Sequence, residues 1–238
     1  TDTTNMKPTV ITAPALKNSS TSPVHIAVGL TFKSLAVGSQ NAYAVDVNGN
    51  LYGWGYDLNG QSGIGVDDRT FTQVPVNILP GQVYRMVDAG NLYAGAVTNE
   101  NNLIIWGYGG DTGTTLTDQK IVTPKQVAGN ISSIYFANTT AYFVGTDNVL
   151  QVWGTVNNGL GNTLDNSIIF NSFHNTGQQV SSIAVSNSTA LAMNLGKQLI
   201  VWGNNVVGNF GNGEKKDEIV EATLIAVEDF LSIAAGKN

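Results

Sequence analysis

The sequence predicts an all-β protein, a β-propeller of four-stranded antiparallel blades with four complete blades and a partial blade at each end. Three observations lead to this prediction: a Trp-Gly pair that recurs four times, an apolar alternating run before each pair, and turn-forming residues at matching places. The only four tryptophans of the chain belong to these pairs, and they are separated by 52, 47 and 49 residues. Such regular spacing is typical of repeat proteins.

The repeated unit extends beyond the Trp-Gly pairs. Gly38 and Gly90 each precede a tryptophan by sixteen residues, and Asn138 and Asn187 take the corresponding place fifteen residues before the third and fourth tryptophans. Gly236 follows Asn187 by 49 residues and begins a fifth unit. The residues that we predict to have structural roles in the repeat are Trp54, Gly55, Trp106, Gly107, Trp153, Gly154, Trp202, Gly203, Gly38, Gly90 and Gly236.

Each unit is expected to form one blade. In the first unit the runs "SLAVG", "NAYAV", "NLYGWG" and "QVPVNIL" alternate with the period of two that half-buried strands have. Turn formers separate the second run from the third in every unit, which predicts an antiparallel meander. These turns lie at Asn48-Gly49, Asn99 to Asn102, Asp147-Asn148 and Asn194 to Gly196. Glu221 to Leu231 has a weak helical pattern, but the repeat register assigns it as strand, turn and strand.

Residues 1–21 are expected to be an N-terminal extension or linker, and residues 22–238 the propeller. Ser22 to Gly29 aligns with the last strand of a preceding blade, and Phe230 to Gly236 aligns with the first strand of a following one. Either these two strands share a fifth blade, or the chain is part of a larger propeller that continues past residue 238. We favour the larger propeller, because open sheet edges are unfavourable.

Composition excludes several classes of function. A net charge of −6 with only 11 Lys and Arg argues against a nucleic-acid partner, which requires clustered positive charge. The chain has no cysteine, so disulfides contribute nothing to its stability. No apolar stretch approaches the ~18 residues of a membrane span, which predicts a soluble protein.

The sequence indicates no catalytic residue, metal ligand or cofactor. His25 and His174 lie in different units and have no neighbours at metal-ligand spacing. The hairpin "DVNGNL" at Asp46 to Leu51 departs from the pattern of a calcium loop. A Gly-x-Ser-x-Gly nucleophile motif is absent, and the glycine-rich stretch Gly107 to Thr115 lacks the Lys of a phosphate-binding loop.

The phrases "WGYDLNGQSGIG" (Trp54 to Gly65) and "WGNNVVGNFGNG" (Trp202 to Gly213) resemble the repeat of the regulator of chromosome condensation family. The resemblance covers about Pro23 to Asn238 and implies a β-propeller, commonly of seven blades. The second unit lacks the Gly-Gln-Leu-Gly type of turn, and the third unit shortens it. Kelch and WD repeats fit less well, because a double glycine of the kelch type occurs once and Trp-Asp does not occur.

We expect a non-enzymatic scaffold that contacts protein partners through loops between blades. The candidate contact loops each follow a Trp-Gly pair: Asp57 to Arg69, Asp111 to Gln119, Asn157 to Ser172 and Asn204 to Glu218. A structural component of a large homo- or hetero-oligomeric assembly, such as a virion or surface complex, is the interpretation that we favour. The resemblance also implies an alternative, since the family includes the nucleotide exchange factor for the small GTPase Ran. A glycan-binding propeller is a third possibility.

Overall fold

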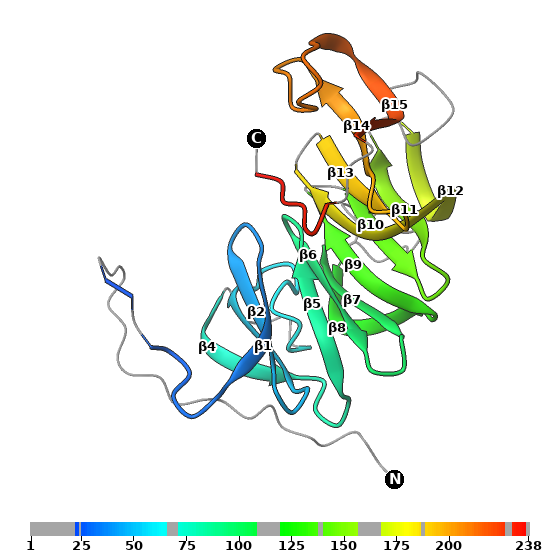
Figure 1. Ribbon diagram of the computed structural model, residues 1–238. Coiled ribbons are helices and arrows are strands. Elements are labelled where there is room, and N and C mark those ends of the chain that lie inside the picture. The colour runs from blue at the N-terminus through cyan, green and yellow to red at the C-terminus, as the bar shows by residue number, and fades with distance from the viewer. Residues whose placement is uncertain are drawn as a thin grey trace. The chain divides into compact units, whose positions relative to one another are not determined.

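The computed structural model describes residues 22, 23, 25–65, 71–108, 120–137, 140–156, 168–186, 189–226 and 230–236 (Figure 1). All the regular structure in these ranges is β-strand, and none of it is helix. The all-β prediction is therefore confirmed. The described part of the chain contains no helix long and apolar enough to cross a bilayer. It forms two compact units, of which the first contains β1–β8 and the second β9–β15.

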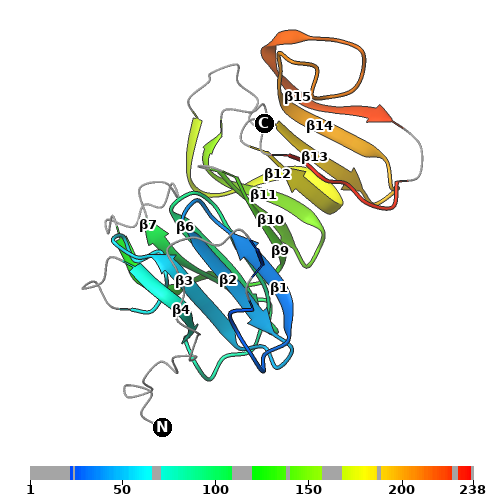
Figure 2. The ribbon, with the colours of Figure 1, turned by 90° about the vertical axis from the view of Figure 1, so that its left-hand side faces the viewer.

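The first unit consists of two four-stranded antiparallel sheets, each a meander in which every strand pairs with the next along the chain (Figure 2). Their strands are β1 (Phe32–Val37), β2 (Asn41–Asp46), β3 (Leu51–Tyr56) and β4 (Phe71–Ile78), followed by β5 (Tyr84–Ala89), β6 (Tyr93–Thr98), β7 (Leu103–Tyr108) and β8 (Lys120–Ala128). These sheets are the first two predicted blades. The tight turns between β2 and β3 and between β6 and β7 lie at the predicted places, with Gly49 at a φ of 88° and Asn101 at 64°.

The second unit is a continuous antiparallel sheet of seven strands. Its strands are β9 (Ile131–Phe136), β10 (Thr140–Gly145), β11 (Val149–Val156), β12 (Ile168–Val185), β13 (Thr189–Asn194), β14 (Leu199–Asn205) and β15 (Lys216–Ala226). The hairpin turn between β13 and β14 has positive φ at Lys197 rather than at one of the predicted turn formers. The strand predicted at the start of Glu221 to Leu231 is the end of β15, and residues 227–229 lie outside the described ranges.

The third and fourth predicted blades differ from the first two in how they are joined. We expected the last strand of the third blade and the first strand of the fourth to be separate, but β12 supplies both. Its residues 168–179 pair with β11 and its residues 180–185 pair with β13. In the first two blades the corresponding places are occupied by Pro80-Gly81 and Gly129-Asn130, which end the strands. In β12, Gly177 takes a φ of 73° at a register shift in the pairing with β11, and the strand continues through it to pair with β13.

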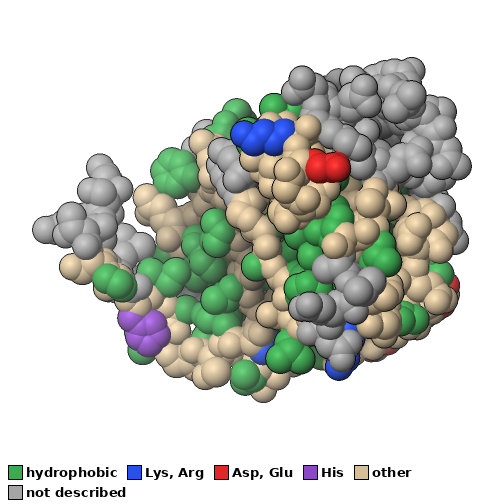
Figure 3. Space-filling model, turned by 45° about the horizontal axis from the view of Figure 1, so that its top comes forward, with side chains coloured by type: hydrophobic (Ala, Val, Ile, Leu, Met, Phe, Trp, Pro, Cys, Tyr) green, Lys and Arg blue, Asp and Glu red, His purple; other side chains and the backbone are tan. Residues whose placement is uncertain are grey.

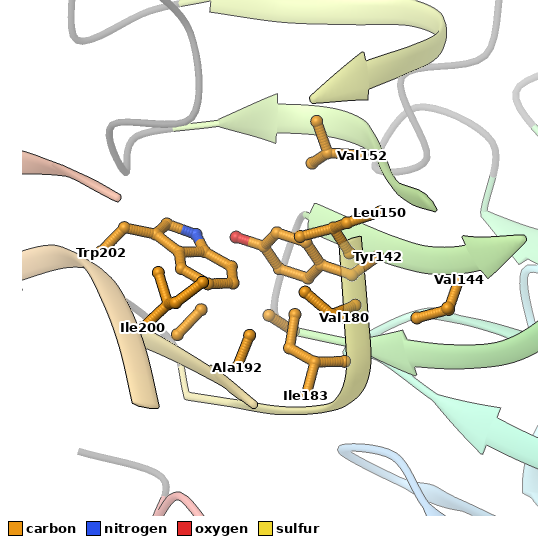
Figure 4. Packing of buried hydrophobic residues seen from close by; sticks show 11 residues of the cluster. Tyr142, Val144, Leu150, Val152, Val180, Ile183, Ala192, Ile200 and Trp202 are labelled. Carbon is orange, nitrogen blue, oxygen red and sulfur yellow. The ribbon is translucent and has the colours of Figure 1, made fainter. Parts of the chain in front are cut away.

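Each unit buries the middle strands of its sheets. All residues of β6 are buried, and so are those of β10. In the second unit Tyr142, Leu150, Val152, Val180, Ile183 and Trp202 lie in one apolar cluster that joins β10–β12 to β13 and β14 (Figure 4). In the second unit, a hydrophobic core therefore lies between the third and fourth blades.

Candidate interaction surface

The four tryptophans occupy equivalent places in the sheets. Each lies on the third strand of its blade, at a point where the register toward the fourth strand shifts, by two residues in the first three blades and by one in the fourth. Each also faces an alanine on the second strand, and a small side chain there leaves room for the indole. These cross-strand pairs are Ala42 with Trp54, Ala94 with Trp106, Ala141 with Trp153 and Ala190 with Trp202. We had not singled out the alanines, although each precedes its tryptophan by twelve residues in the sequence.

The glycine after the tryptophan lets the third strand pass close to the second. Gly55 and Gly107 have φ angles of 110° and 104°, which disfavour any L side chain. A Cβ at Gly55 would lie 2.4 Å from the carbonyl oxygen of Gln40, and one at Gly107 would lie 2.5 Å from that of Leu92. Gly203 has a φ of 106°, so the same conformation recurs in the fourth blade.

The indole of Trp106 is covered by the blade that precedes it. Its exposed fraction is 0%, its Nε1 donates a hydrogen bond of 2.9 Å to the carbonyl oxygen of Gln61, and its ring lies edge-on to Tyr43 at 5.5 Å. The Tyr43 hydroxyl also donates to that carbonyl. Burial raises the pKa of the Tyr43 hydroxyl, so this group remains a protonated donor at neutral pH.

The fourth blade repeats this packing with its own residues. Trp202 is buried, and its ring lies edge-on to Tyr142 of the third blade with centroids 5.9 Å apart. Figure 4 shows the hydroxyl end of Tyr142 directed toward the Trp202 indole. Trp153 is also buried, whereas Trp54 is only partly buried. A tyrosine of one blade thus meets the tryptophan of the next in both units.

The loop after the first Trp-Gly pair, residues 57–65, has a defined backbone. The buried Asp57 carboxylate accepts a hydrogen bond of 2.9 Å from the Ser62 amide, and the Gly60 amide donates to the Asp57 carbonyl. Gly60, Gly63 and Gly65 all have positive φ. The loop then reaches β8 of the second blade, where the Gly65 amide donates to the Val122 carbonyl at 3.0 Å.

The loop after the fourth Trp-Gly pair, residues 205–213, has the same backbone in spite of a different sequence. Asn205 takes the place of Asp57, and its Oδ1 accepts a hydrogen bond of 3.0 Å from the Phe210 amide. Gly208, Gly211 and Gly213 have φ angles of 80°, 67° and 80°, against 75°, 74° and 78° at the corresponding glycines of the first loop. We call these two segments the first glycine loop (57–65) and the fourth glycine loop (205–213).

The two glycine loops expose apolar side chains at the same place. Leu58 in the first loop and Val206 in the fourth follow the capping residue directly, and both are more than 40% exposed. Val207 is also exposed. On the face drawn in Figure 3, hydrophobic and uncharged polar side chains of the described residues cover most of the surface, and charged side chains are few. The loops therefore combine a fixed backbone with side chains that could contact an apolar partner surface.

The other sequence-predicted residues divide into three groups. Gly38 and Gly90 lie against each other, since a Cβ at Gly38 would be 2.7 Å from the Gly90 carbonyl oxygen. A Cβ at Gly236 would meet no heavy atom of the described residues within 4 Å. The predicted turns at Asn138 and Asn187, the loop Asp111 to Gln119 and residues 157–167 of the third loop lie outside the described ranges. No group of three or more potential metal-ligating side chains occurs among the described residues.

Comparison with known proteins indicates which repeat family the chain resembles. Residues 32–61, which include the first Trp-Gly pair and the first five residues of its glycine loop, match the regulator of chromosome condensation (RCC1) repeat. The chain is 25% identical over 213 residues to the ultraviolet-B receptor UVR8 of Arabidopsis thaliana, covering 85% of this chain and 48% of the receptor. Residues 32–61 thus match a repeat of the regulator of chromosome condensation type, and the chain resembles an RCC1-like protein over most of its length. The resemblance on which the sequence analysis relied is thus confirmed.

Solved structures with low sequence identity to the chain have the same fold. Human WBSCR16 superposes with a TM-score of 0.74 at 20% identity, covering 91% of this chain and 59% of that one. Prp20p of Saccharomyces cerevisiae superposes with a TM-score of 0.66 at 18% identity, covering 83% of this chain and 51% of that one. The fold is a β-propeller type built from four-stranded antiparallel blades. The chain spans about half the length of these relatives.

Proposed function

We propose that this RCC1-like protein is a non-enzymatic interaction scaffold that contacts protein partners through the glycine loops. The observation that carries the proposal is that the first and fourth glycine loops share one backbone conformation but present different exposed side chains. A repeated site for one small ligand would have the same side chains in each blade. Dissimilar side chains on equivalent loops suit an extended protein surface instead.

The physical basis of the proposal is preorganisation. The side-chain cap at Asp57 or Asn205 and the positive-φ glycines hold the backbone, so little conformational entropy remains to be lost on binding. Exposed Leu58, Val206 and Val207 then offer apolar area that a partner can remove from water. The related Prp20p supports a protein-binding role, because it was crystallised with Kap60 and its binding to Gsp1p and histones was described.

A photo-crosslinking experiment tests the scaffold proposal. A crosslinking amino acid is placed at Val207 in the fourth glycine loop, or at Leu195 in the hairpin at the opposite end of β14, which is also an exposed apolar position. Crosslinks to discrete proteins are expected from position 207 in extracts of the native source, and these should be lost when Val206 is changed to Asp. Equal yields from both positions, or adducts insensitive to V206D, would contradict the proposal.

Nucleotide exchange on a small GTPase is a second candidate function, favoured by the likeness to Prp20p and its reported binding to Gsp1p. It is tested by measuring release of a labelled guanine nucleotide from a panel of small GTPases. A scaffold leaves the release rate unchanged, whereas an exchange factor accelerates release from one member of the panel. Glycan binding, and a place in a virion or surface assembly, stay predictions that a glycan array and native mass measurements can test.

A further inference from the structure

Asparagine is a chemically labile residue, and it is most labile when a glycine follows it. The backbone nitrogen of the glycine can attack the side-chain carbonyl carbon of the asparagine, because the glycine has no Cβ to obstruct the approach. The reaction requires that the glycine amide can turn toward that carbon, so the surrounding structure decides which pairs react. The chain contains four such pairs: Asn48-Gly49, Asn59-Gly60, Asn158-Gly159 and Asn212-Gly213. The third of them lies outside the described ranges.

The glycines of the first two pairs are held in place. Gly49 and Gly60 are buried, and each amide donates a hydrogen bond to the carbonyl three residues earlier, at 3.0 and 3.1 Å respectively. A Cβ at Gly49 would overlap the side chain of Val83, and one at Gly60 would lie 2.6 Å from Cα of Val122. Neither amide can turn toward its asparagine unless a hydrogen bond breaks and neighbouring residues move.

The pair Asn212-Gly213, at the end of the fourth glycine loop, has a different environment. Both residues are exposed. The Gly213 amide makes no hydrogen bond to any residue that the structure describes. A Cβ at Gly213 would also meet no heavy atom of the described ranges within 4 Å. This amide can therefore turn without breaking a hydrogen bond and without displacing a described neighbour.

The side chain of Asn212 is directed along the chain that follows it. Its Oδ1 accepts a hydrogen bond of 3.1 Å from the Glu214 amide. The bond folds the side chain over the Gly213 peptide unit, which brings Cγ to the side of the Gly213 nitrogen. An N–H donor at Oδ1 also stabilises the negative charge that develops on this oxygen when Cγ is attacked.

We propose that Asn212 is a site of spontaneous deamidation, which produces isoaspartate in the fourth glycine loop. The Gly213 nitrogen forms a bond to Cγ of Asn212, the bond from Cγ to Nδ2 breaks, and the amide proton leaves with the side-chain nitrogen as ammonia. Water then opens the five-membered imide, at Cγ to give aspartate or at the main-chain carbonyl to give isoaspartate. Water is the only co-reactant, and nothing is oxidised or reduced.

Both products change the loop chemically but leave its cap intact. Each replaces a neutral amide by a carboxylate beside Glu214, and isoaspartate also lengthens the backbone by one methylene group. The hydrogen bonds from the Phe210 amide to Asn205 and from the Gly211 amide to the Gly208 carbonyl lie before the reacting pair. The reaction therefore proceeds in protein that stays folded, and it does not depend on the proposed scaffold function.

Peptide mapping of the incubated protein tests the proposal. The purified 238-residue chain is held at neutral pH, and mass spectrometry with electron-transfer fragmentation follows aspartate and isoaspartate at each pair over time. We expect Asn212 to react at least about tenfold faster than Asn48 or Asn59, which react only when their segments open. In urea the same three pairs should react at rates within about threefold of one another, because unfolding removes the protection.

Two variants serve as controls. Gly213→Ala should slow the reaction at Asn212, because the added Cβ obstructs the attacking nitrogen, and it should leave the rates at Asn48 and Asn59 unchanged. Asn48→Gln should leave the rate at Asn212 unchanged.

Three results would overturn the proposal. The first is a rate at Asn212 in the folded protein no higher than the rates at Asn48 and Asn59. The second is a rate at Asn212 that rises more than about tenfold in urea, because the folded loop would then hold the amide away from Cγ. The third is formation of aspartate without isoaspartate at an undiminished rate in G213A, which indicates direct hydrolysis of the side-chain amide.

Discussion

Replacing Trp106 by alanine perturbs the blade-to-blade contact at its centre. The side chain is fully buried between Tyr43 and the first glycine loop, and its Nε1 is bonded to the Gln61 carbonyl. A buried tryptophan removes about 150 to 250 Å² from water, which corresponds to ~4 to 6 kcal/mol at ~25 cal/mol per Å². Measured tryptophan-to-alanine substitutions in cores cost ~3 to 5 kcal/mol, and we expect a loss in that range.

Urea denaturation followed by far-UV circular dichroism measures this loss. Trp54→Ala is the matched control, because Trp54 has the same place in its blade but is only partly buried, and we expect roughly half the loss or less. Trp106→Phe should lie between the two, since it keeps a ring on Tyr43 but removes the indole donor. Equal losses for W106A and W54A would refute the argument that the preceding blade covers the tryptophan.

Three further substitutions test other contacts. Asp57→Ala should lower the free energy of unfolding, measured by urea denaturation, by ~1 to 2 kcal/mol because the Ser62 amide loses its hydrogen-bond acceptor. Asp57→Asn should lower it much less, because asparagine accepts the equivalent hydrogen bond in the fourth glycine loop. Gly107→Ala should lower the free energy of unfolding by more than ~2 kcal/mol, and Gly81→Ala by only ~1 kcal/mol. Both glycines have positive φ, but only at Gly107 would the added Cβ also collide with neighbouring backbone atoms. Burial raises the pKa of the Tyr43 hydroxyl in the folded protein, so this hydroxyl loses its proton at a lower pH in the unfolded chain. The free energy of unfolding should therefore fall as pH rises above 10.0, and it should fall less steeply in the Tyr43→Phe variant.

The fold could be predicted from the sequence because each blade carries its own local pattern. The Trp-Gly pairs, the alternating runs and the turn formers all depend on neighbouring residues, and the strands of the four blades lie where these patterns indicate. The strands expected at Ser22 to Gly29 and at Phe230 to Gly236 are not formed in the described residues of those segments. The joining of two blades through β12 could not be predicted in this way. Whether a strand ends depends on the turn residues, and Gly177 allows a bend without ending the pairing.

The candidate surface was predicted only in outline. Most of the described part of the two predicted loops is loop, but Asn204, Asn205 and Lys216 to Glu218 belong to strands, and residues 66–69 lie outside the described ranges. The common backbone of the two loops depends on a cap that aspartate and asparagine both supply. The spacing of residues could not identify Gln61, because its backbone carbonyl, and not its side chain, accepts the hydrogen bond from the Trp106 indole. The alanine opposite each tryptophan could have been found, since its distance of twelve residues is constant.

Indole hydrogen exchange tests the central claim most directly, namely that a tryptophan is covered by the glycine loop of the blade before it. With four tryptophans in the chain, a nitrogen-15 NMR spectrum contains four indole N–H signals that substitution can assign. We predict slow exchange for Trp106, whose Nε1 is buried and bonded to Gln61, and fast exchange for Trp54, which is only partly buried. Fast exchange at Trp106, or equal rates at the two positions, would contradict the claim.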